Sequence, residues 1–332
     1  MVAERKPLTG KSTIQEWTMS PVGGPVIGQF LAAIGQDESV LDQVKNLPLE
    51  TLITVSQGQL TQENVDDLVR QANGGVLPEP EVAAPAAARF AGKTIIVTGA
   101  GSGIGKATAE RIIAEGGRVI GVDISDDRIQ DLVTASPKDT VVAVCGDITN
   151  DDDVAHIVRA AGGQIDGLAN VAGIMDGMVP LHETSNELWD RVFAVNVTGM
   201  FKLSRAVLPK LLAAGKGSVV NVASEASLRG NAAGTAYTAS KHAVVGITRS
   251  AAFLYGPSGI RTNAVAPGPT ATAISGEFRS EFSQARLGKF LAMIPPVTTA
   301  ATLAALITWL LSDDSTNING QVIASDGGWA VQ

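Results

Sequence analysis

A glycine-rich loop near residue 100 most constrains what this chain can fold into. Residues 93–97 (KTIIV) are a short β-branched apolar run, residues 98–105 (TGAGSGIG) follow at once, and residues 107–115 have helical character. Glycines at such a turn let the backbone approach a pyrophosphate, and the start of the helix supplies free N–H groups. The order of strand, loop and helix therefore predicts a dinucleotide site. Its loop contacts are expected from Gly99, Ser102, Gly103, Ile104 and Gly105.

Beyond this loop, strand-like and helix-like stretches continue to alternate. Because strands that alternate with helices form βαβ units, they predict a parallel sheet covered by helices on both faces. Right-handed crossovers then give a Rossmann-like, doubly wound domain. The expected fold class is α/β, preceded by a small all-α module. Later strands are expected at residues 118–122, 141–145, 165–169, 218–222, 260–265 and 322–324.

A proline- and alanine-rich segment separates two parts of unequal size. Residues 78–91 contain three prolines and no periodic apolar pattern, a composition typical of a semi-rigid linker. We therefore expect a small helical module over residues 1–77 and a Rossmann-fold domain over residues 92–332.

Helical spacing dominates the first part. Ser12 and Gln15 have the spacing of a capping box, and Thr61 can cap the last helix. Apolar residues recur at helical intervals over residues 26–34 and again over residues 40–47. Since no cluster of histidine, cysteine or carboxylates indicates a site there, we expect a bundle that packs on the large domain or on a second copy.

The charge balance and the single cysteine exclude several classes of function. The 25 basic and 33 acidic side chains give a net charge of −8, which argues against nucleic acid or an anionic membrane as partner. Cys145 alone cannot form an internal disulfide or a cysteine-rich metal site; we expect it to be buried in its strand and expect no metal. No apolar run suits a bilayer span, and the first residues lack a signal-peptide pattern, which predicts a cytoplasmic protein.

An acidic residue at the end of the second expected strand bears on the choice of cofactor. Asp123 follows Gly105 by 18 residues, where a carboxylate can accept hydrogen bonds from ribose hydroxyls and repels a 2′-phosphate. Neither the loop before Gly105 nor the position directly after Asp123 is basic, and Arg128 is five residues further on. This pattern favours NAD over NADP. Asp147, after the third strand, is expected to face the adenine.

A tyrosine and a lysine four residues apart form the candidate catalytic pair. Tyr237 and Lys241 in YTASK would share one face of a helix. A tyrosine is a poor base at neutral pH because its ordinary pKa is near 10. A neighbouring ammonium stabilises the phenolate and lowers that pKa. The pair could then be the general base of alcohol oxidation or the general acid of carbonyl reduction.

Several further motifs occur in a characteristic order. With them the chain resembles the short-chain dehydrogenase/reductase family, of the compact single-domain type, over about residues 92–332. The matching motifs are residues 98–105, GDI at 146–148, ANVAG at 169–173, Asn196, NVAS at 221–224, YTASK at 237–241, APG at 266–268 and SDGGW at 325–329.

The resemblance implies a role for each catalytic residue. Tyr237 would transfer the proton, and Lys241 would lower its pKa and bind the nicotinamide ribose. Ser224 would hydrogen-bond the substrate oxygen, and Asn196 would hold a water that passes the proton towards Lys241. Hydride would move between the nicotinamide and a secondary alcohol carbon, without a metal.

The resemblance also implies further cofactor contacts and an assembly. Family members are usually tetramers, so we expect a homo-oligomer that acts on a small alcohol or ketone. The remaining contacts to NAD are expected from Ile124, Asp147, Ile148, Asn170, Ala172, Gly173, Tyr237, Lys241, Pro267, Gly268, Thr270 and Thr272.

Two alternatives to an NAD-dependent alcohol dehydrogenase or carbonyl reductase stay open. One is a β-ketoacyl-carrier-protein reductase, a type that usually prefers NADPH. The other is an interaction or scaffold protein that uses its N-terminal helices and senses a cofactor with the Rossmann domain. The substrate is not identified: residues 273–296, where the family selects substrates, mix phenylalanines with Arg279, Arg286 and Lys289.

Overall fold

The computed structural model describes the 332-residue chain except residues 1–6, 43, 57–58, 79–87, 273–276 and 292. The described residues form two compact units. The smaller comprises residues 7–78 with the short segments 269–272 and 295–299, and the larger comprises the remaining described residues from 88 onwards.

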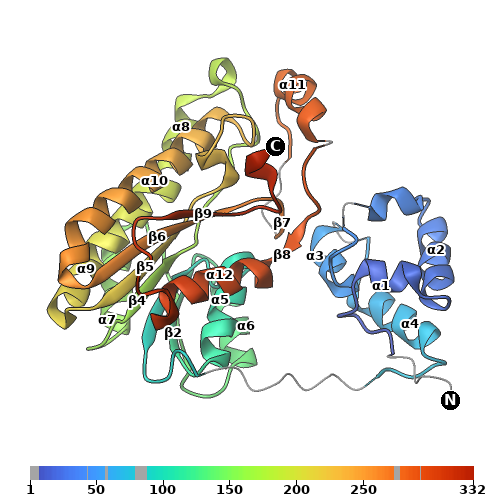
Figure 1. Cartoon of the computed structure of the whole chain (residues 1–332), viewed down its shortest axis with the longest axis horizontal. Helices are drawn as coiled ribbons and strands as arrows, with labels where there is room; N and C mark the ends of the chain where they lie inside the picture. The colour runs from blue at the N-terminus through green and yellow to red at the C-terminus, as the bar shows by residue number, and fades with distance from the viewer. Residues whose placement is uncertain (1–6, 43, 57–58, 79–87, 273–276, 292) are drawn as a thin grey trace. The chain divides into compact units, whose positions relative to one another are not determined.

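The larger unit is built on a parallel sheet, which confirms the expected fold class. Its strands are β1 (Thr94–Thr98), β2 (Arg118–Asp123), β3 (Val141–Cys145), β4 (Gly167–Asn170), β5 (Gly217–Val222), β6 (Ile260–Pro267) and β9 (Val322–Ser325). Their order is β3-β2-β1-β4-β5-β6-β9, and every neighbouring pair is parallel (Figure 1). The expected strand positions agree to within two residues at each end.

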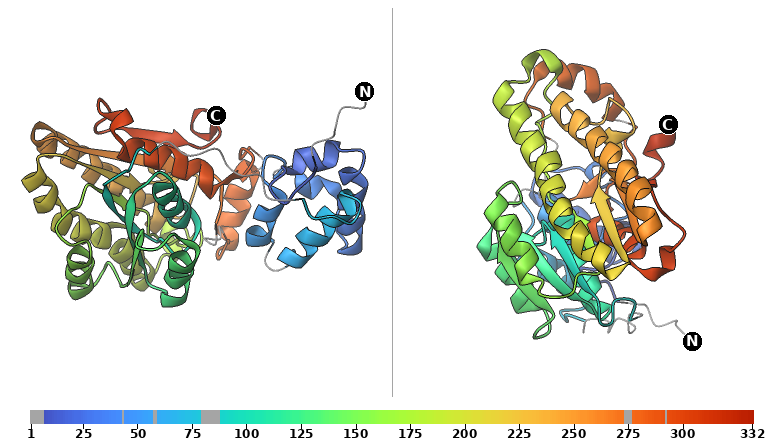
Figure 2. Two further views of the ribbon diagram at one scale, coloured as in Figure 1. Left: turned by 90° about the horizontal axis from the view of Figure 1, so that it is seen from below. Right: turned by 90° about the vertical axis from the view of Figure 1, so that its left-hand side faces the viewer.

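Helices cover both faces of this sheet. The helices of the larger unit are α5 (Gly103–Ala114), α6 (Asp126–Ala135), α7 (Asp151–Ala160), α8 (Asn186–Phe193), α9 (Met200–Ala214), α10 (Thr235–Tyr255), α11 (Glu281–Leu291) and α12 (Ala300–Leu311). Buried side chains of α5, α6 and α12 pack on one face, and those of α7 and α9 on the other. The right-hand view of Figure 2 looks onto α9 and α10, which cover their face of the sheet.

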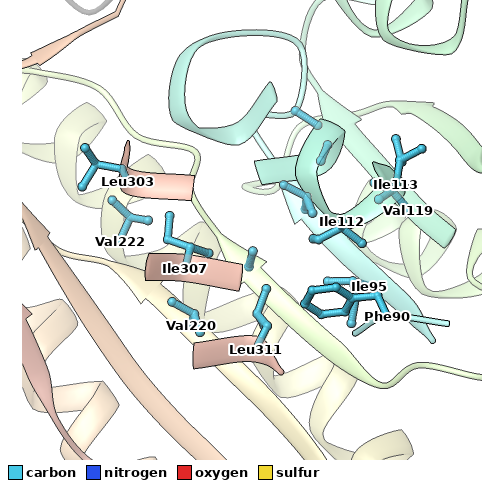
Figure 3. Close-up of a cluster of buried hydrophobic side chains, with 14 of the residues drawn as sticks. Phe90, Ile95, Ile112, Ile113, Val119, Val220, Val222, Leu303, Ile307 and Leu311 are labelled. Carbon is cyan, nitrogen blue, oxygen red and sulfur yellow. The ribbon is translucent and has the colours of Figure 1, made fainter. Parts of the chain in front are cut away.

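The strands are apolar on both sides because both sides are buried. In β1, Ile95 and Val97 belong to the cluster under α5 and α12, whereas Ile96 belongs to the cluster under α7 and α9. Figure 3 shows the first cluster, in which Leu303 and Ile307 of α12 lie over β5. This two-sided core fixes the sheet, so the loops at the carboxyl ends of its strands have a rigid base.

The strand order reverses beside β1, and this reversal places the candidate site. From β1 the chain moves outward to β2 and β3, then crosses back to β4 on the other side of β1. Loops leaving β1 and β4 therefore diverge, and open α/β sheets bind ligands at such a switch point. The glycine loop after β1 and the ANVAG segment at the end of β4 both lie there.

The smaller unit has a separate helical core. Its helices are α1 (Ile14–Met19), α2 (Gly23–Ala33), α3 (Leu52–Val55) and α4 (Gln62–Ala72), with 3₁₀ turns at Glu38–Leu41 and Leu49–Thr51. Trp17, Ile27 and Leu68 are among the buried side chains of one apolar cluster. A two-strand pair, β7 (Thr270–Ala271) with β8 (Thr298–Thr299), belongs to the same unit.

The first helix is capped one residue later than expected. Thr13, not Ser12, accepts from the backbone N–H of Glu16 at 3.2 Å, and the Glu16 carboxylate accepts from the N–H of Thr13 at 2.6 Å. Ser12 instead accepts from the N–H of Thr9. Adjacent hydroxyl residues both fit the capping pattern, and the acidic partner at Glu16 decides between them. The expected cap at Thr61 is confirmed.

The helical spacing over residues 40–47 does not mark a regular helix. Among the residues of this stretch that the structure describes, only the 3₁₀ turn Glu38–Leu41 forms, although Leu41 and Leu47 are both buried. The spacing thus reflects which side chains enter the core. None of the helices in the described ranges is both long and apolar enough to span a membrane.

Truncation of Trp17 tests the two-unit organisation. The indole is fully buried, and its Nε1–H donates to the carbonyl of Thr9 at 3.1 Å. Trp17→Ala leaves a cavity that is expected to cost about 3–5 kcal/mol of the smaller unit's unfolding free energy. Calorimetry should show one transition shifted down and one unchanged. Met19→Ala, at a position on α1 that is 76% exposed, should shift neither, and a single transition that moves as a whole would contradict independent units.

Candidate active site

The tyrosine and lysine of the YTASK motif meet on one face of α10. The Lys241 ammonium lies 5.4 Å from the centre of the Tyr237 ring, because residues four apart on a helix are stacked one turn above the other. Lys241 is only 3% exposed, and its Nζ donates to the carbonyl of Val222 at 2.9 Å. Burial lowers the pKa of Lys241 to about 8, so the ammonium is still mainly charged at neutral pH.

The tyrosine hydroxyl is held in its neutral form, which differs from the expectation that Lys241 lowers the pKa of Tyr237. Burial raises the pKa of Tyr237 to about 12, the Ser224 hydroxyl lowers it, and the Asp176 carboxylate raises it further. Ser224 reaches the tyrosine because it follows β5 by two residues, at the carboxyl edge of the sheet. A protonated phenol beside a serine hydroxyl and an ammonium can donate a proton to a carbonyl oxygen or, when ionised, accept one from an alcohol.

Asn196 links this helix to the loop after β4. Its main chain lies in a π-helical turn, Ala194–Gly199, a wider turn that is frequent at functional sites. Its amide accepts from the N–H of Ile174 at 2.8 Å and donates to the Ile174 carbonyl at 3.0 Å and to the Ser240 hydroxyl at 3.1 Å. The side chain thus ties the loop to α10 beside Lys241. The predicted role of Asn196 in holding a water stays a prediction.

A buried aspartate that the sequence analysis missed completes the surroundings of the tyrosine. Asp176 is 1% exposed and accepts from the N–H of Tyr237 at 2.9 Å and from the N–H of Met178 at 3.0 Å. Two features of the sequence could have pointed to Asp176. One is a carboxylate in the loop after a central strand, and the other is Gly234, which precedes α10 and cannot cap it with a side chain. Sequence alone does not reveal that these two segments meet.

The glycine loop has the close packing that a dinucleotide needs. Gly99 has a φ of +67°, a conformation that glycine adopts without strain. A Cβ on Gly105 would overlap the Gly99 carbonyl, so the first turn of α5 can approach the loop only with glycine there. Ser102 precedes the helix without a side-chain hydrogen bond to it. Because the first N–H groups of a helix have no partner within it, those of Gly103 to Gly105 are suited to bind a phosphate.

Asp123 is fixed by three donors. One oxygen accepts from the N–H of Gly101 at 3.0 Å, and the other from the N–H of Ser125 at 3.0 Å and from the guanidinium of Arg128 at 2.9 Å. A Cβ on Gly101 would lie 2.7 Å from the Cβ of Arg128. The helical turn of α6 therefore brings an arginine to the acidic residue, although five positions separate them in sequence.

Residues from β4 and its loop lie between the glycine loop and the catalytic side chains. A Cβ on Gly173 would stand 3.2 Å from the Asn196 amide oxygen and 3.4 Å from Lys241 Nζ. Ala172 donates its N–H to the Thr98 hydroxyl. Asn170 is buried, and its side-chain amide donates to Ser204 and Asn221. The side-chain oxygen Oδ1 of Asn170 has no hydrogen bond among the described residues. These features fit a bound dinucleotide.

The other predicted cofactor residues are spread over the strand ends. Ile124 is exposed and Ile148 is buried, and Asp147 accepts from the N–H of Thr149. Pro267 ends β6, and Gly268 donates its N–H to Ser325 at 3.1 Å. Thr270 and Thr272 belong to the smaller unit. Their part in a cofactor site stays a prediction.

The expectation that Cys145 is buried is wrong. Its side chain is exposed, with Sγ 3.6 Å from the carbonyl of Ile124. The physical reason is position: β3 is an edge strand, and Cys145 is its last residue. No group of three potential metal ligands occurs among the described residues.

Known proteins are similar to the part of the chain that carries this candidate site. A family model described as short chain dehydrogenase matches residues 93–282. The 3beta-hydroxysteroid dehydrogenase 2 of Eggerthella lenta is 36% identical over 251 residues, which cover 73% of this chain and 96% of that protein. The structure of a levodione reductase is 34% identical with a TM-score of 0.68, covering 73% of this chain and 99% of its own.

A second solved structure bears on the cofactor. The 3-ketoacyl-(acyl-carrier-protein) reductase of Brucella melitensis, complexed with NADH, is 29% identical with a TM-score of 0.66 and covers 72% of this chain and 99% of its own. Other similar structures hold NAD or NADP.

Proposed function

Because the chain belongs to the short-chain dehydrogenase/reductase family and is thus an oxidoreductase, we propose that it interconverts a secondary alcohol and a carbonyl with NAD. The observation that carries the proposal is the grouping of Ser224, Tyr237 and Lys241 around one phenol. The bound nicotinamide would supply or accept the hydride. The chain's own residues then have to bind the substrate oxygen and move one proton.

Each catalytic side chain has a proton-handling role in this proposal. In oxidation the Tyr237 phenolate accepts the alcohol proton, and in reduction the phenol donates a proton to the carbonyl oxygen. The Ser224 hydroxyl donates a hydrogen bond to the same oxygen and stabilises its developing charge. The Lys241 ammonium stabilises the phenolate and keeps further N–H donors for a ribose hydroxyl. Asn196 holds the loop against α10 and would support the proton path.

The cofactor would lie across the switch point of the sheet. Its pyrophosphate would rest on the glycine loop and the first turn of α5. Asp123 would accept from the adenosine ribose, and Asn170 and Gly173 would line the nicotinamide half. The preference for NAD rests on the Asp123 carboxylate, which repels a 2′-phosphate.

The substrate is proposed as a secondary alcohol with a sizeable apolar body. Phe282 of α11 packs edge-on against His182 in the loop after β4, with ring centres 5.0 Å apart. Arg279 donates its backbone N–H to the carbonyl of Gly177 at 3.0 Å. These contacts hold α11 near the loop that carries Asp176. They would give the substrate pocket an aromatic surface.

The alternative of a β-ketoacyl-carrier-protein reductase is supported by the likeness to the Brucella melitensis enzyme. That alternative predicts turnover of acetoacetyl thioesters. The proposed function predicts that cyclic and steroidal alcohols are better substrates and that NAD is the better cofactor.

A substrate panel decides between these readings. The full-length protein is assayed for NAD⁺ reduction with steroidal, cyclic and linear secondary alcohols, and for NADH and NADPH oxidation with the matching ketones and acetoacetyl-CoA. Turnover of a secondary alcohol or ketone with NAD⁺ or NADH supports the proposal. Activity confined to the thioester with NADPH would select the alternative, and no turnover with any pair would refute both.

The proposal also covers the assembly and the role of residues 1–77. Phe201 on α9 and Phe253 on α10 are exposed, and exposed aromatic residues on a helical face support contact between copies. We propose a cytoplasmic homotetramer, with residues 1–77 as an accessory module, residues 78–91 as linker and residues 92–332 as catalytic domain. Light scattering that gives a monomer mass would contradict the assembly.

A further inference from the structure

The loop after β4 places a buried carboxylate at the start of the catalytic helix. Asp176 accepts from the N–H of Tyr237, the third residue of α10, at 2.9 Å. Its second oxygen accepts from the N–H of Met178 at 3.0 Å, which fixes the side chain within its own loop. The residue is 1% exposed, so these backbone donors replace its hydration.

The helix is shaped to receive this carboxylate. Gly234 precedes α10 and has no side chain to cap it. A Cβ on Gly234 would lie 2.5 Å and 2.6 Å from the two oxygens of Asp176 and 2.5 Å from the N–H nitrogen of Val179. The N–H of Thr235 donates to the Val179 carbonyl at 2.9 Å. The loop thus docks on the helix start only because position 234 is glycine.

The contact satisfies a requirement of the helix. The first N–H groups of a helix have no partner within it, and a negative charge there is favoured by the helix dipole. Usually a side chain just before the helix accepts from the second or third N–H. Here Asp176, 61 residues upstream of Tyr237, takes that place.

The same carboxylate acts on the tyrosine hydroxyl through its charge. Among the described residues, the groups facing Tyr237 are Lys241 from its own helix, Ser224 after β5 and Asp176 after β4. Arg279, which precedes α11, is exposed, and its side chain packs on Gly177 of this loop. The Asp176 carboxylate raises the pKa of Tyr237, and the Ser224 hydroxyl lowers it. Asp176 therefore opposes ionisation of the phenol, which the Lys241 ammonium favours.

We propose that Asp176 is a positioning residue that caps the catalytic helix from the neighbouring loop and sets the pH range in which Tyr237 exchanges its proton. The inference rests on the proposed function, in which Tyr237 is the acid/base. Asp176 would touch neither substrate nor cofactor. Asp176 would affect the reaction in two ways: it positions the backbone N–H of Tyr237, and its charge lies beside the Tyr237 phenol.

Asp176→Asn tests the charge. The amide keeps an oxygen that can accept from the N–H of Tyr237 but has no negative charge. Ionisation of the Tyr237 phenol therefore costs less free energy. The rise of alcohol-oxidation rate with pH is therefore expected to move to lower pH by about one unit, with NADH affinity unchanged by titration calorimetry. Glu115→Gln is the matched control, since Glu115 is also a buried carboxylate but pairs with Arg89 and Arg111; its pH profile should equal that of the unmodified enzyme.

Gly234→Ala tests the positioning. The added methyl displaces the carboxylate from the helix start while its charge stays in the loop, so kcat is expected to fall at least tenfold with little change in the affinity for NADH. Circular dichroism establishes that each variant is folded. If Asp176→Asn does not fold, the spectroscopic titration of phenolate in Gly234→Ala gives the second readout, because the chain has only one other tyrosine, Tyr255.

The outcomes separate this inference from the proposed function. The inference is overturned if the unmodified enzyme is active, Asp176→Asn has the same pH profile and Gly234→Ala retains its kcat. That result leaves the proposed function intact. An unmodified enzyme without turnover on the substrate panel overturns the proposed function itself. A downward shift in Asp176→Asn that Glu115→Gln does not reproduce supports the inference.

Discussion

Tyr237→Phe is expected to reduce turnover by about 10²–10⁴-fold, the usual contribution of one general acid/base. The ring and its packing remain, while the hydroxyl beside Ser224 and Lys241 that would exchange the proton is removed. NADH affinity should stay within about twofold, since in the proposed function the hydroxyl contacts the substrate oxygen and not the cofactor. Steady-state rates at saturating cofactor, with calorimetric titration of NADH, measure the two effects separately.

The other tyrosine provides a matched control for this substitution. Tyr255 is the last residue of α10, and Tyr255→Phe makes the same chemical change at the opposite end of the same helix. It should retain full turnover. Equal activity of the Tyr237→Phe and unmodified enzymes would remove Tyr237 from the mechanism, and an equal loss in both variants would indicate damage to the helix.

Asp123→Asn is expected to shift the ratio of NADH to NADPH affinity by about 10–100-fold towards NADPH. The carboxylate now accepts from Gly101, Ser125 and Arg128, and the amide can keep only part of this set. The proposed hydrogen bond from the ribose to a charged acceptor would be lost, and with it the proposed repulsion of a 2′-phosphate. Arg128 also loses its ion pair and becomes free to contact the phosphate. Titration calorimetry with both cofactors gives the ratio.

A second substitution isolates the contribution of the arginine. In Asp123→Asn/Arg128→Ala the loss of NADH affinity should persist, while the gain in NADPH affinity should largely disappear. Arg128→Ala alone should change NADH affinity only slightly, because half of the arginine side chain is exposed. A gain in NADPH affinity that survives in the double variant would mean that another group binds the 2′-phosphate.

Local pattern was most informative where a single strand or loop decides the structure. The run at residues 93–97 and the glycines after it could be assigned because a two-sided buried strand and a tight phosphate turn each need one narrow set of residues. The spacing of Tyr237 and Lys241 was equally direct, since a helix places residues four apart on one face. Ambiguity arose where two neighbours satisfy one pattern, as with Ser12 and Thr13 at the first helix.

Predictions of side-chain contacts and burial were weaker where they depend on how segments are arranged in space. Arg128 is five residues from Asp123 in the sequence, yet the turn into α6 brings its guanidinium to 2.9 Å from the carboxylate. The apolar run at residues 141–145 predicts a buried Cys145, but β3 lies at the sheet edge and Cys145 is exposed. Burial at a strand end depends on the neighbouring elements, which a strand's own composition does not encode.

The sequence by itself determined the fold class, the position of the glycine loop and the identity of the candidate acid/base pair, because these depend on contacts within a few residues. Only the tertiary structure decided what surrounds Tyr237. The carboxylate that caps its helix comes from a loop 61 residues upstream and fits only because position 234 is glycine. Helix capping and pKa values depend on distance and burial in space, and a linear sequence states neither.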